Sequence, residues 1–191
     1  AGCTTVVHGP HRNRPTLDAM AARGVYFDPN VDLVLRNYFE NKERFLGIGN
    51  YTEEGFAQMR AAVPRVLEAF RTALEIPELK VVFGTDAIAG SHGRNVEELI
   101  YRIVTGGQDP MAAIVSATSL AAESLGLGDA IGTVAPGYAA DLIGVAGDPL
   151  EDPSALGRVV FVMRQGRVVR WWPDSPTDPD QPIIGSSTSS R

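Results

Sequence analysis

Three polar side chains follow short apolar stretches, each at the point where a buried strand is expected to end. His8 follows "TVV", Asp28 follows "VYF" and Asp86 follows "VVFGT". Because functional groups gather at the carboxyl ends of parallel strands, the three could face one side of a single sheet. Imidazole and carboxylate groups are ligands for divalent metals, and an aspartate can take a proton from metal-bound water. The spacing also allows a structural interpretation, in which His8 caps backbone groups and Asp86 forms a turn.

The segment after Asp86, "AIAGSHGRN", consists mainly of small residues and carries two further candidates. His92 is followed by a glycine, which permits close approach of a ligand, so this histidine could contact a substrate. A surface-loop histidine without a chemical role is the competing interpretation. Arg94 could bind an anionic group such as a carboxylate. Two further residues could do the same, although ordinary helix-surface positions are favoured for them: Arg36 and Tyr38.

Two motifs resemble known sites but do not fit them. The stretch "AGSHG" is one residue away from a serine nucleophile elbow, but Ser91 lies well past the strand end and no histidine follows His92. The stretch "GLGDAIG" has glycines spaced as GxGxxxG and does not follow a strand, so a dinucleotide site is not expected there.

The elements that would position these residues alternate between strand and helix over residues 1–125. Such alternation predicts a parallel sheet whose faces are covered by helices. The expected strands span 4–7, 25–27 and 80–84. The expected helices span 16–23, 32–46, 53–75, 95–105 and 110–124.

Several helix ends carry capping signals. Thr52 is expected to open the long helix, in which Pro64 should produce a kink. Asp109 is an expected N-cap before a proline at the first helical position. Asn95 and Glu98 have the spacing of a capping box within one helix.

The pattern changes after residue 125. The stretch "TVAPGYAADLIGVA" predicts a strand, a turn and a second strand, and "RVVFVMRQGRVVRWW" predicts a hairpin turning at Gln165 and Gly166. Residues 126–172 are therefore expected to form a small antiparallel unit. Residues 173–191 are rich in Pro, Asp and Ser and predict a disordered tail.

Composition limits the possible partners and compartments. The 191 residues carry a net charge of −6 and no basic cluster, which argues against nucleic acid or an anionic membrane as a partner. The single cysteine, Cys3, indicates a reducing compartment and thus a cytoplasmic location. The sequence starts without Met and enters a strand directly, so we expect it to begin inside a fold.

These segments together resemble the C-terminal half of an amidohydrolase, in particular the imidazolonepropionase-like and prolidase-like metal-dependent hydrolases. The resemblance covers nearly all of residues 1–170. It is carried by "VVHG", by "VVFGTDAIAGSHGRN", by the helix "SATSLAAESLGL" and by "PGYAADL", which occur in the order of the family.

The resemblance implies a fold and a role for each candidate. Residues 1–125 would supply strands six to eight of a distorted (β/α)8 barrel, and residues 126–172 the C-terminal strands of a small β-sandwich. His8 would bind a metal after strand six. Asp86 would bind metal after strand eight and act as the catalytic base, while His92 matches a substrate-side histidine.

Other parts of the family's metal site are absent from this sequence. The HxH pair after strand one, the bridging lysine and the histidine after strand five have no counterpart. Lys80 lies at the wrong end of its expected strand, and Lys42 lies in an expected helix. Only two ligands remain, whereas a tight zinc site needs three or four.

The expected function is a metal-dependent amidohydrolase that cleaves a C–N amide bond of a dipeptide or an N-acyl amino acid. Metal-activated water would attack, Asp86 would serve as base, and His92 and Arg94 would contact the substrate. One or two divalent ions, with zinc as the expected metal, would bind in the intact protein. The alternative is a non-catalytic fragment or binding module. Exposed barrel edges would favour association with a missing N-terminal half or with a second copy.

Overall fold

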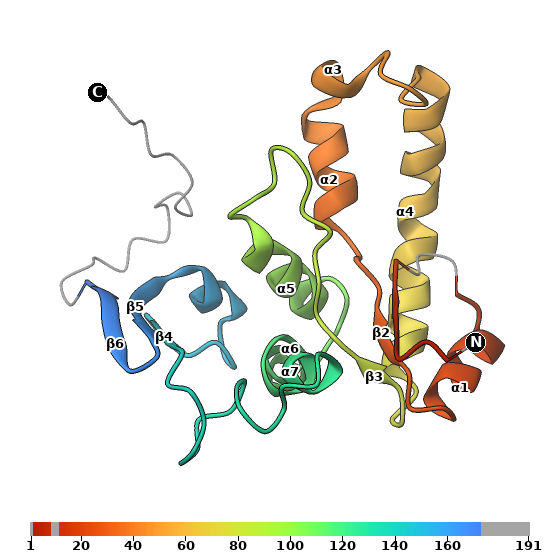
Figure 1. Ribbon diagram of the computed structural model, residues 1–191. Helices are drawn as coiled ribbons and strands as arrows, with labels where there is room; N and C mark the ends of the chain where they lie inside the picture. Colours follow the sequence, from red (N-terminus) through yellow and green to blue (C-terminus); the bar gives the residue numbers. More distant parts are fainter. Residues whose placement is uncertain (1, 9–11, 173–191) are drawn as a thin grey trace, which may run out of the picture.

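The computed structural model describes residues 2–8 and 12–172; the expected disordered tail at 173–191 lies outside the described residues. Figure 1 shows two sheets on opposite sides of a group of helices. One is a parallel sheet with the order β1-β2-β3, and the other is an antiparallel sheet with the order β4-β5-β6. The α/β class expected from the sequence is therefore confirmed. No helix among the described residues is long and apolar enough to cross a membrane.

The parallel sheet is short and is covered by helices. Its strands are β1 (Thr5–Val7), β2 (Tyr26–Asp28) and β3 (Lys80–Val81). The helices before β3 are α1 (Arg14–Ala21), α2 (Leu33–Glu40), α3 (Lys42–Phe45) and α4 (Glu53–Leu74). Leu17, Phe27 and Phe70 have no exposed surface and form the centre of the core between this sheet and its helices.

Three helices follow the parallel sheet, namely α5 (Asn95–Val104), α6 (Pro110–Ala117) and α7 (Ser119–Ser124). The antiparallel sheet contains β4 (Leu142–Val145), β5 (Val159–Arg164) and β6 (Arg167–Trp171), with a short 3-10 helix, η1 (Pro153–Gly157), before β5. The expected hairpin is present, with positive φ at Gln165 and Gly166 as a tight two-residue turn requires.

The structure confirms the two helix N-caps that were expected at Thr52 and Asp109. The Thr52 side chain accepts a hydrogen bond from the backbone N–H of Gly55, and Asp109 accepts one from that of Ala112. Helix α4 runs through Pro64 as one continuous helix, and the kink expected at this proline stays a prediction.

Several expected elements are shorter or divided. The helix expected over 32–46 is interrupted at Asn41, which has φ −112° and ψ 24°. The helix expected over 110–124 is interrupted at Thr118, whose hydroxyl donates to the carbonyl of Ile114 and competes with the regular backbone pattern. Strand β3 has two residues rather than five, because the chain leaves the ladder after the bond from Val82 N–H to Phe27 O. The first strand expected in "TVAPGYAADLIGVA" is absent; within that stretch β4 is the strand found.

The capping box expected at Asn95 and Glu98 is wrong. Residue 94 is the N-cap of α5 and makes no side-chain capping bond. The carboxylate of Glu98 instead accepts hydrogen bonds from the backbone N–H groups of Val31, Asp32 and Leu33, at 2.7, 2.9 and 2.7 Å. Glu98 therefore caps α2, a different helix, because burial brings its carboxylate to the free N–H groups at the start of α2.

Candidate active site

His8 and Asp86 meet at the carboxyl end of the parallel sheet. His8 directly follows β1, and Asp86 lies five residues after the end of β3. Although β2 lies between these two strands in the sheet, His8 Nε2 lies 3.6 Å from Asp86 Oδ2. The two side chains are 56% and 39% exposed, so a ligand from outside the described residues can reach both.

Both residues have a backbone conformation that is rare outside glycine. His8 has φ 54° and Asp86 has φ 47°, in the left-handed region. Such conformations cost free energy, and they persist where the surrounding structure holds them in place and are frequent at functional sites. The pair is therefore held by its environment rather than by local backbone preference.

Asp28 lies at the end of β2, the strand between β1 and β3, and is more deeply buried than His8 and Asp86. Its carboxylate packs so close to Gly84 that a Cβ at residue 84 would overlap Asp28 Oδ2. Burial raises the pKa of Asp28, while the charge of Arg102 and a hydrogen bond from Asn30 act against that shift. Asp28 thus supports the chain between β3 and Asp86.

The donor set at this edge fits part of a metal site. His8 supplies a nitrogen and Asp86 supplies carboxylate oxygens, which are ligands that zinc accepts. Within residues 2–8 and 12–172, no group of three or more His, Cys, Asp or Glu side chains is placed to hold a metal. If this edge holds a metal, the described residues offer His8 and Asp86 as ligands, and the others would have to come from outside them.

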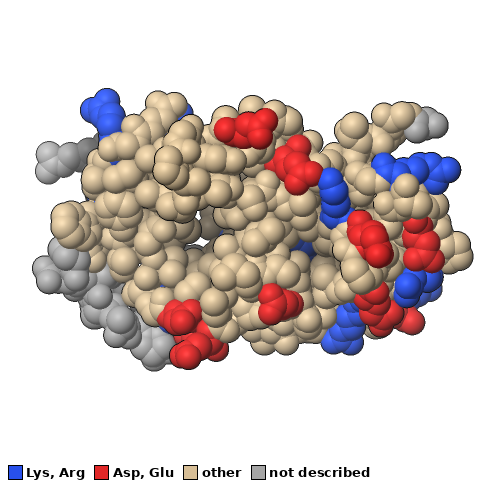
Figure 2. Space-filling view, turned by 90° about the horizontal axis from the view of Figure 1, so that it is seen from below, with Lys and Arg blue, Asp and Glu red and all other residues tan. Residues whose placement is uncertain are grey.

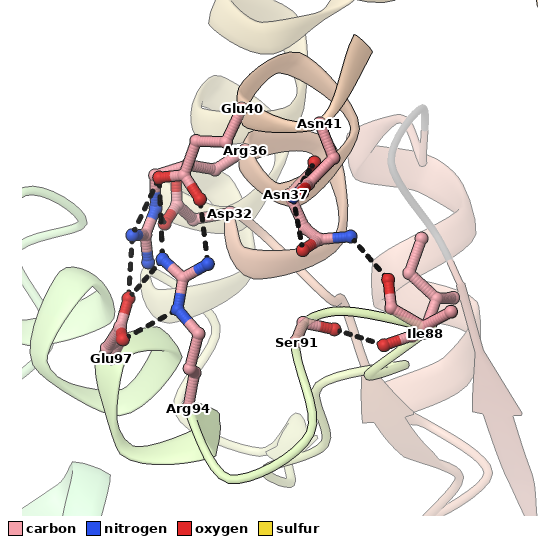
Figure 3. Close-up of polar contacts among 10 residues, drawn as sticks. Asp32, Arg36, Asn37, Glu40, Asn41, Ile88, Ser91, Arg94 and Glu97 are labelled. Carbon is pink, nitrogen blue, oxygen red and sulfur yellow. Dashed lines mark hydrogen bonds and ion pairs between the residues drawn. The ribbon is translucent and has the colours of Figure 1, made fainter. Parts of the chain in front are cut away.

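The loop between Asp86 and α5 carries His92, whose side chain is exposed to solvent. Ser91 is fully buried, and its hydroxyl donates to the carbonyl oxygen of Ile88 at 2.8 Å. A serine committed to a backbone turn in this way has a structural role, which agrees with the sequence argument against a nucleophile elbow. The amide of Asn37 on α2 donates to the carbonyl of Ala89 in the same loop (Figure 3).

Arg94 is engaged by two carboxylates (Figure 3). It contacts both oxygens of Glu97 at 2.8 Å, and its Nη1 lies 2.7 Å from Glu40 Oε2. Hydrogen bonds to Glu97 and Glu40 raise the pKa of Arg94. Arg36 joins the same network through Asp32 and Glu97, both at 2.7 Å. This geometry favours a role for both arginines in joining α2 to α5, and substrate binding by Arg94 stays a prediction.

Glu98 and Arg102 form a buried pair that the sequence argument missed. Both are fully buried, and Arg102 donates from Nη2 to the carbonyl of Val82 at 3.0 Å. Burial raises the pKa of Glu98 and lowers that of Arg102. A signal was present, since the pair lies on the apolar stripe of α5 beside Leu99 and Ile103. The pair links the start of α2 to the end of β3.

Tyr38 on α2 lies within electrostatic range of Asp86. Its hydroxyl is 2.7 Å from that of Tyr51, and the two rings are 5.0 Å apart. Burial, the contact with Tyr51 and the charge of Asp86 raise the pKa of Tyr38 to about 12. Tyr38 therefore keeps its proton at neutral pH and can act as a hydrogen-bond donor.

A parallel sheet covered by helices, with polar side chains meeting at its carboxyl end, is the arrangement of α/β enzymes. Residues 2–169 match the model of the Amidohydrolase family, and the chain therefore belongs to the amidohydrolase family.

Curated relatives are considerably longer than this chain. An ochratoxinase of Aspergillus niger is 27% identical over 153 residues, which are 80% of this chain and 30% of the relative. An adenine deaminase of Methanothrix thermoacetophila is 32% identical over 132 residues, which are 61% of this chain and 22% of the relative. The chain thus spans less than a third of these relatives.

Solved structures give the same picture. A Xaa-Pro dipeptidase with bound methionine superposes with a TM-score of 0.75 at 34% identity, over 88% of this chain and 40% of that one. A prolidase complexed with N-methylphosphonate-L-proline superposes with a TM-score of 0.75 at 25% identity, over 90% of this chain and 41% of that one. The chain has part of an amidohydrolase fold, while the assignment of its strands to a complete barrel and a sandwich stays a prediction.

Proposed function

We propose that the chain is part of a metal-dependent amidohydrolase that hydrolyses a C–N amide bond, with a dipeptide or an N-acyl amino acid as substrate. One observation carries the proposal: His8 and Asp86 lie 3.6 Å apart at the carboxyl end of the sheet in a member of this family. The similarity to a Xaa-Pro dipeptidase and to an ochratoxinase supports an amide as the bond that is cleaved.

His8 and Asp86 would hold one or two divalent ions, with zinc as the expected metal, together with ligands from outside the described residues. When bound, such a metal supplies Lewis acidity and lowers the pKa of a water molecule. Asp86 would accept the proton of the attacking water and return it to the leaving nitrogen. Its exposed carboxylate beside His8 is accessible for both transfers.

The loop and α2 would contribute the substrate contacts. His92 is exposed on the same loop as Asp86 and is the candidate for orienting the substrate. Tyr38 would present a neutral hydroxyl near Asp86, where a carbonyl oxygen could accept its hydrogen bond. Arg94 would keep the helices together and touch the substrate only if it exchanges one of its two carboxylate partners.

The experiment that tests this proposal is Asp86→Asn in the complete protein that contains this chain. Loss of a positioned general base typically costs about 10²–10⁴-fold in rate, and loss of a metal ligand should add to that. Turnover should be measured on a panel of dipeptides and N-acyl amino acids. Asp109→Asn, on an exposed helix cap, is the matched control that should keep normal turnover. Near-normal turnover of Asp86→Asn would contradict the assignment of the base.

A second candidate is a non-catalytic fragment or binding module, and the incomplete ligand set among the described residues favours it. In either case, the expected partners are the N-terminal half of a barrel or a second copy of the chain. A cytoplasmic location belongs to the same proposal, since the lone Cys3 is a free, exposed thiol. Zinc content should be measured on the isolated chain. Binding of stoichiometric zinc that is lost in His8→Ala would contradict the interpretation as a non-catalytic fragment.

A further inference from the structure

Asn37 is a fully buried amide on α2. Its Nδ2 donates to the carbonyl of Ala89 at 3.1 Å, and its Oδ1 accepts from Asn41 Nδ2 at 3.1 Å (Figure 3). Burying an amide is unfavourable unless its polar atoms are hydrogen-bonded. An apolar side chain of similar size at position 37 would leave the carbonyl of Ala89 and the amide of Asn41 without these hydrogen bonds.

The carbonyl that Asn37 binds lies between two residues of the proposed site. Ala89 is three residues after Asp86 and three residues before His92. Ser91 closes a turn within the loop through Ile88. Among the described residues, Asn37 is the only residue of another element whose side chain hydrogen-bonds the backbone of residues 85–93.

The loop backbone also packs directly against this amide. Gly90 has φ 94°, and a Cβ at that residue would lie 3.2 Å from Asn37 Oδ1 and 3.7 Å from Asn41 Nδ2. The contact thus combines a hydrogen bond with close packing at position 90, where glycine fits more easily than any other residue. Asp86, with its left-handed φ of 47°, lies four residues before this contact and needs its surroundings to keep that conformation.

We infer that Asn37 is a positioning residue, which fixes the path of the loop so that Asp86 reaches His8 and His92 faces the substrate. The inference rests on the proposed function for its catalytic consequence, but the contact with the loop is independent of that function. Asn37 acts through the loop and does not touch the reacting atoms.

The sharpest variant is Asn37→Asp, which keeps the shape and removes the donor. At neutral pH, the introduced carboxylate would face the carbonyl of Ala89 and repel it, so the loop should move. A misplacement of about 1 Å can cost about 10²-fold in rate. At lower pH the introduced carboxyl is protonated and can again donate to Ala89, while its other oxygen still accepts from Asn41. We therefore expect kcat/KM, relative to the unmodified protein, to recover as the pH falls.

Two measurements test the inference, one on the chain itself and one on the complete enzyme. Hydrogen exchange of residues 86–93 in the isolated chain should be about 10-fold or more faster in Asn37→Asp at neutral pH and should approach the unmodified rate at low pH. In the complete enzyme, kcat/KM should follow the same pH dependence. Asp109→Ala, which removes an exposed helix cap far along the chain, controls for a general loss of stability.

The outcomes separate the inference from the proposed function. If Asn37→Asp and Asp109→Ala change loop exchange and kcat/KM alike at every pH, Asn37 has no positioning role. If Asn37→Asp loosens the loop but Asp86→Asn keeps full activity, the contact is real and the proposed base is wrong. Should Asn37→Asp fail to fold, Asn37→Ser gives the same test, because a serine is too short to reach Ala89, and loop exchange equal to that of Asp109→Ala would again overturn the inference.

Discussion

The two sheets of this chain differ in how they are covered. Of the eighteen buried hydrophobic side chains among the described residues, seventeen lie before residue 125, and the other is Ala155. Every residue of β6 is exposed, including Val168, Val169 and Trp171 at 54%, 57% and 68%. On the face drawn in Figure 2, Lys, Arg, Asp and Glu are denser toward the end with α1 and α4, although β5 and β6 carry Arg164, Arg167 and Arg170.

This difference shows what each region can do on its own. The α/β region buries enough apolar surface to hold polar groups inside it, including the pair Glu98 and Arg102 and the amide of Asn37. Glu98 and Asn37 are hydrogen-bonded, whereas Nε and Nη1 of Arg102 have no hydrogen-bond partner among the described residues. Buried polar groups that are well bonded give a site a defined geometry. The antiparallel sheet keeps apolar side chains in solvent, which is typical of a surface that another element covers.

Among the polar contacts, the largest effect on stability should come from Glu98→Ala in the α/β region. It leaves Arg102 as an unpaired buried charge and frees three N–H groups at the start of α2. Breaking a buried pair in this way costs about 3–5 kcal/mol of unfolding free energy. Urea denaturation measures it, with Glu97→Ala as a control that should cost less. A loss below about 1 kcal/mol would mean that the α/β region does not depend on this buried pair.

A smaller effect should appear on acidification and should differ between the regions. A hydrogen bond from Arg94 lowers the pKa of Glu40, and in Glu97 the bonds from Arg94 and Arg36 outweigh the raising effect of burial. Because these pKa values are lowered on folding, the stabilisation is present above the ordinary value of 4.5 and is lost as the pH falls below it.

The other region provides an internal comparison. Hydrogen bonds from Ser154 and Arg158 lower the pKa of Asp152 to about 2. In NMR titrations of the carboxyl carbons, Arg94→Ala should return the pKa values of Glu40 and Glu97 toward the ordinary value of 4.5 and leave that of Asp152 unchanged. Unchanged titration of Glu40 and Glu97 in this variant would contradict the assigned contacts.

The smallest effect on stability should come from Trp171→Ser in β6. An exposed side chain without buried contacts changes the free energy of unfolding by less than about 0.5 kcal/mol. The matched control is Phe27→Ser in the buried core, for which removal of an aromatic ring alone costs about 3–5 kcal/mol. Sedimentation should also show weaker self-association for Trp171→Ser. A large loss of stability in this variant would break the contrast between the two sheets.

The hairpin was predictable because its turn depends on neighbouring residues, whereas contacts between residues far apart in the sequence were not predictable. Gln165 and Gly166 adopt the positive φ values that their turn requires, because a tight turn depends on adjacent residues only. The sequence predicted that Glu98 caps its own helix, α5, whereas it caps α2. Its partners could not be predicted because they lie more than sixty residues earlier in the chain. The break at Asn41 likewise has no clear signal in the sequence, since the residues around it favour a helix.

The proximity of His8 and Asp86 was predictable from the sequence, whereas the residues that hold the surrounding loop in place were not. The rule that strand ends meet at one edge placed His8 and Asp86 on the same side of the sheet, and they lie 3.6 Å apart. Asn37 could not be found this way, because an amide within a helical pattern gives no indication of which backbone carbonyl it will meet. The sequence predicted that Arg94 is available to bind an anionic group. In the structure it is paired with Glu40 on α2 and Glu97 on α5.

The most direct test of the central claim is anomalous diffraction at the zinc edge from crystals of the complete protein that contains this chain. The account predicts a metal peak within about 2.0–2.2 Å of a His8 nitrogen and an Asp86 oxygen. The peak should weaken or disappear in His8→Ala. An active enzyme whose metal is bound without His8 and Asp86 would contradict the account.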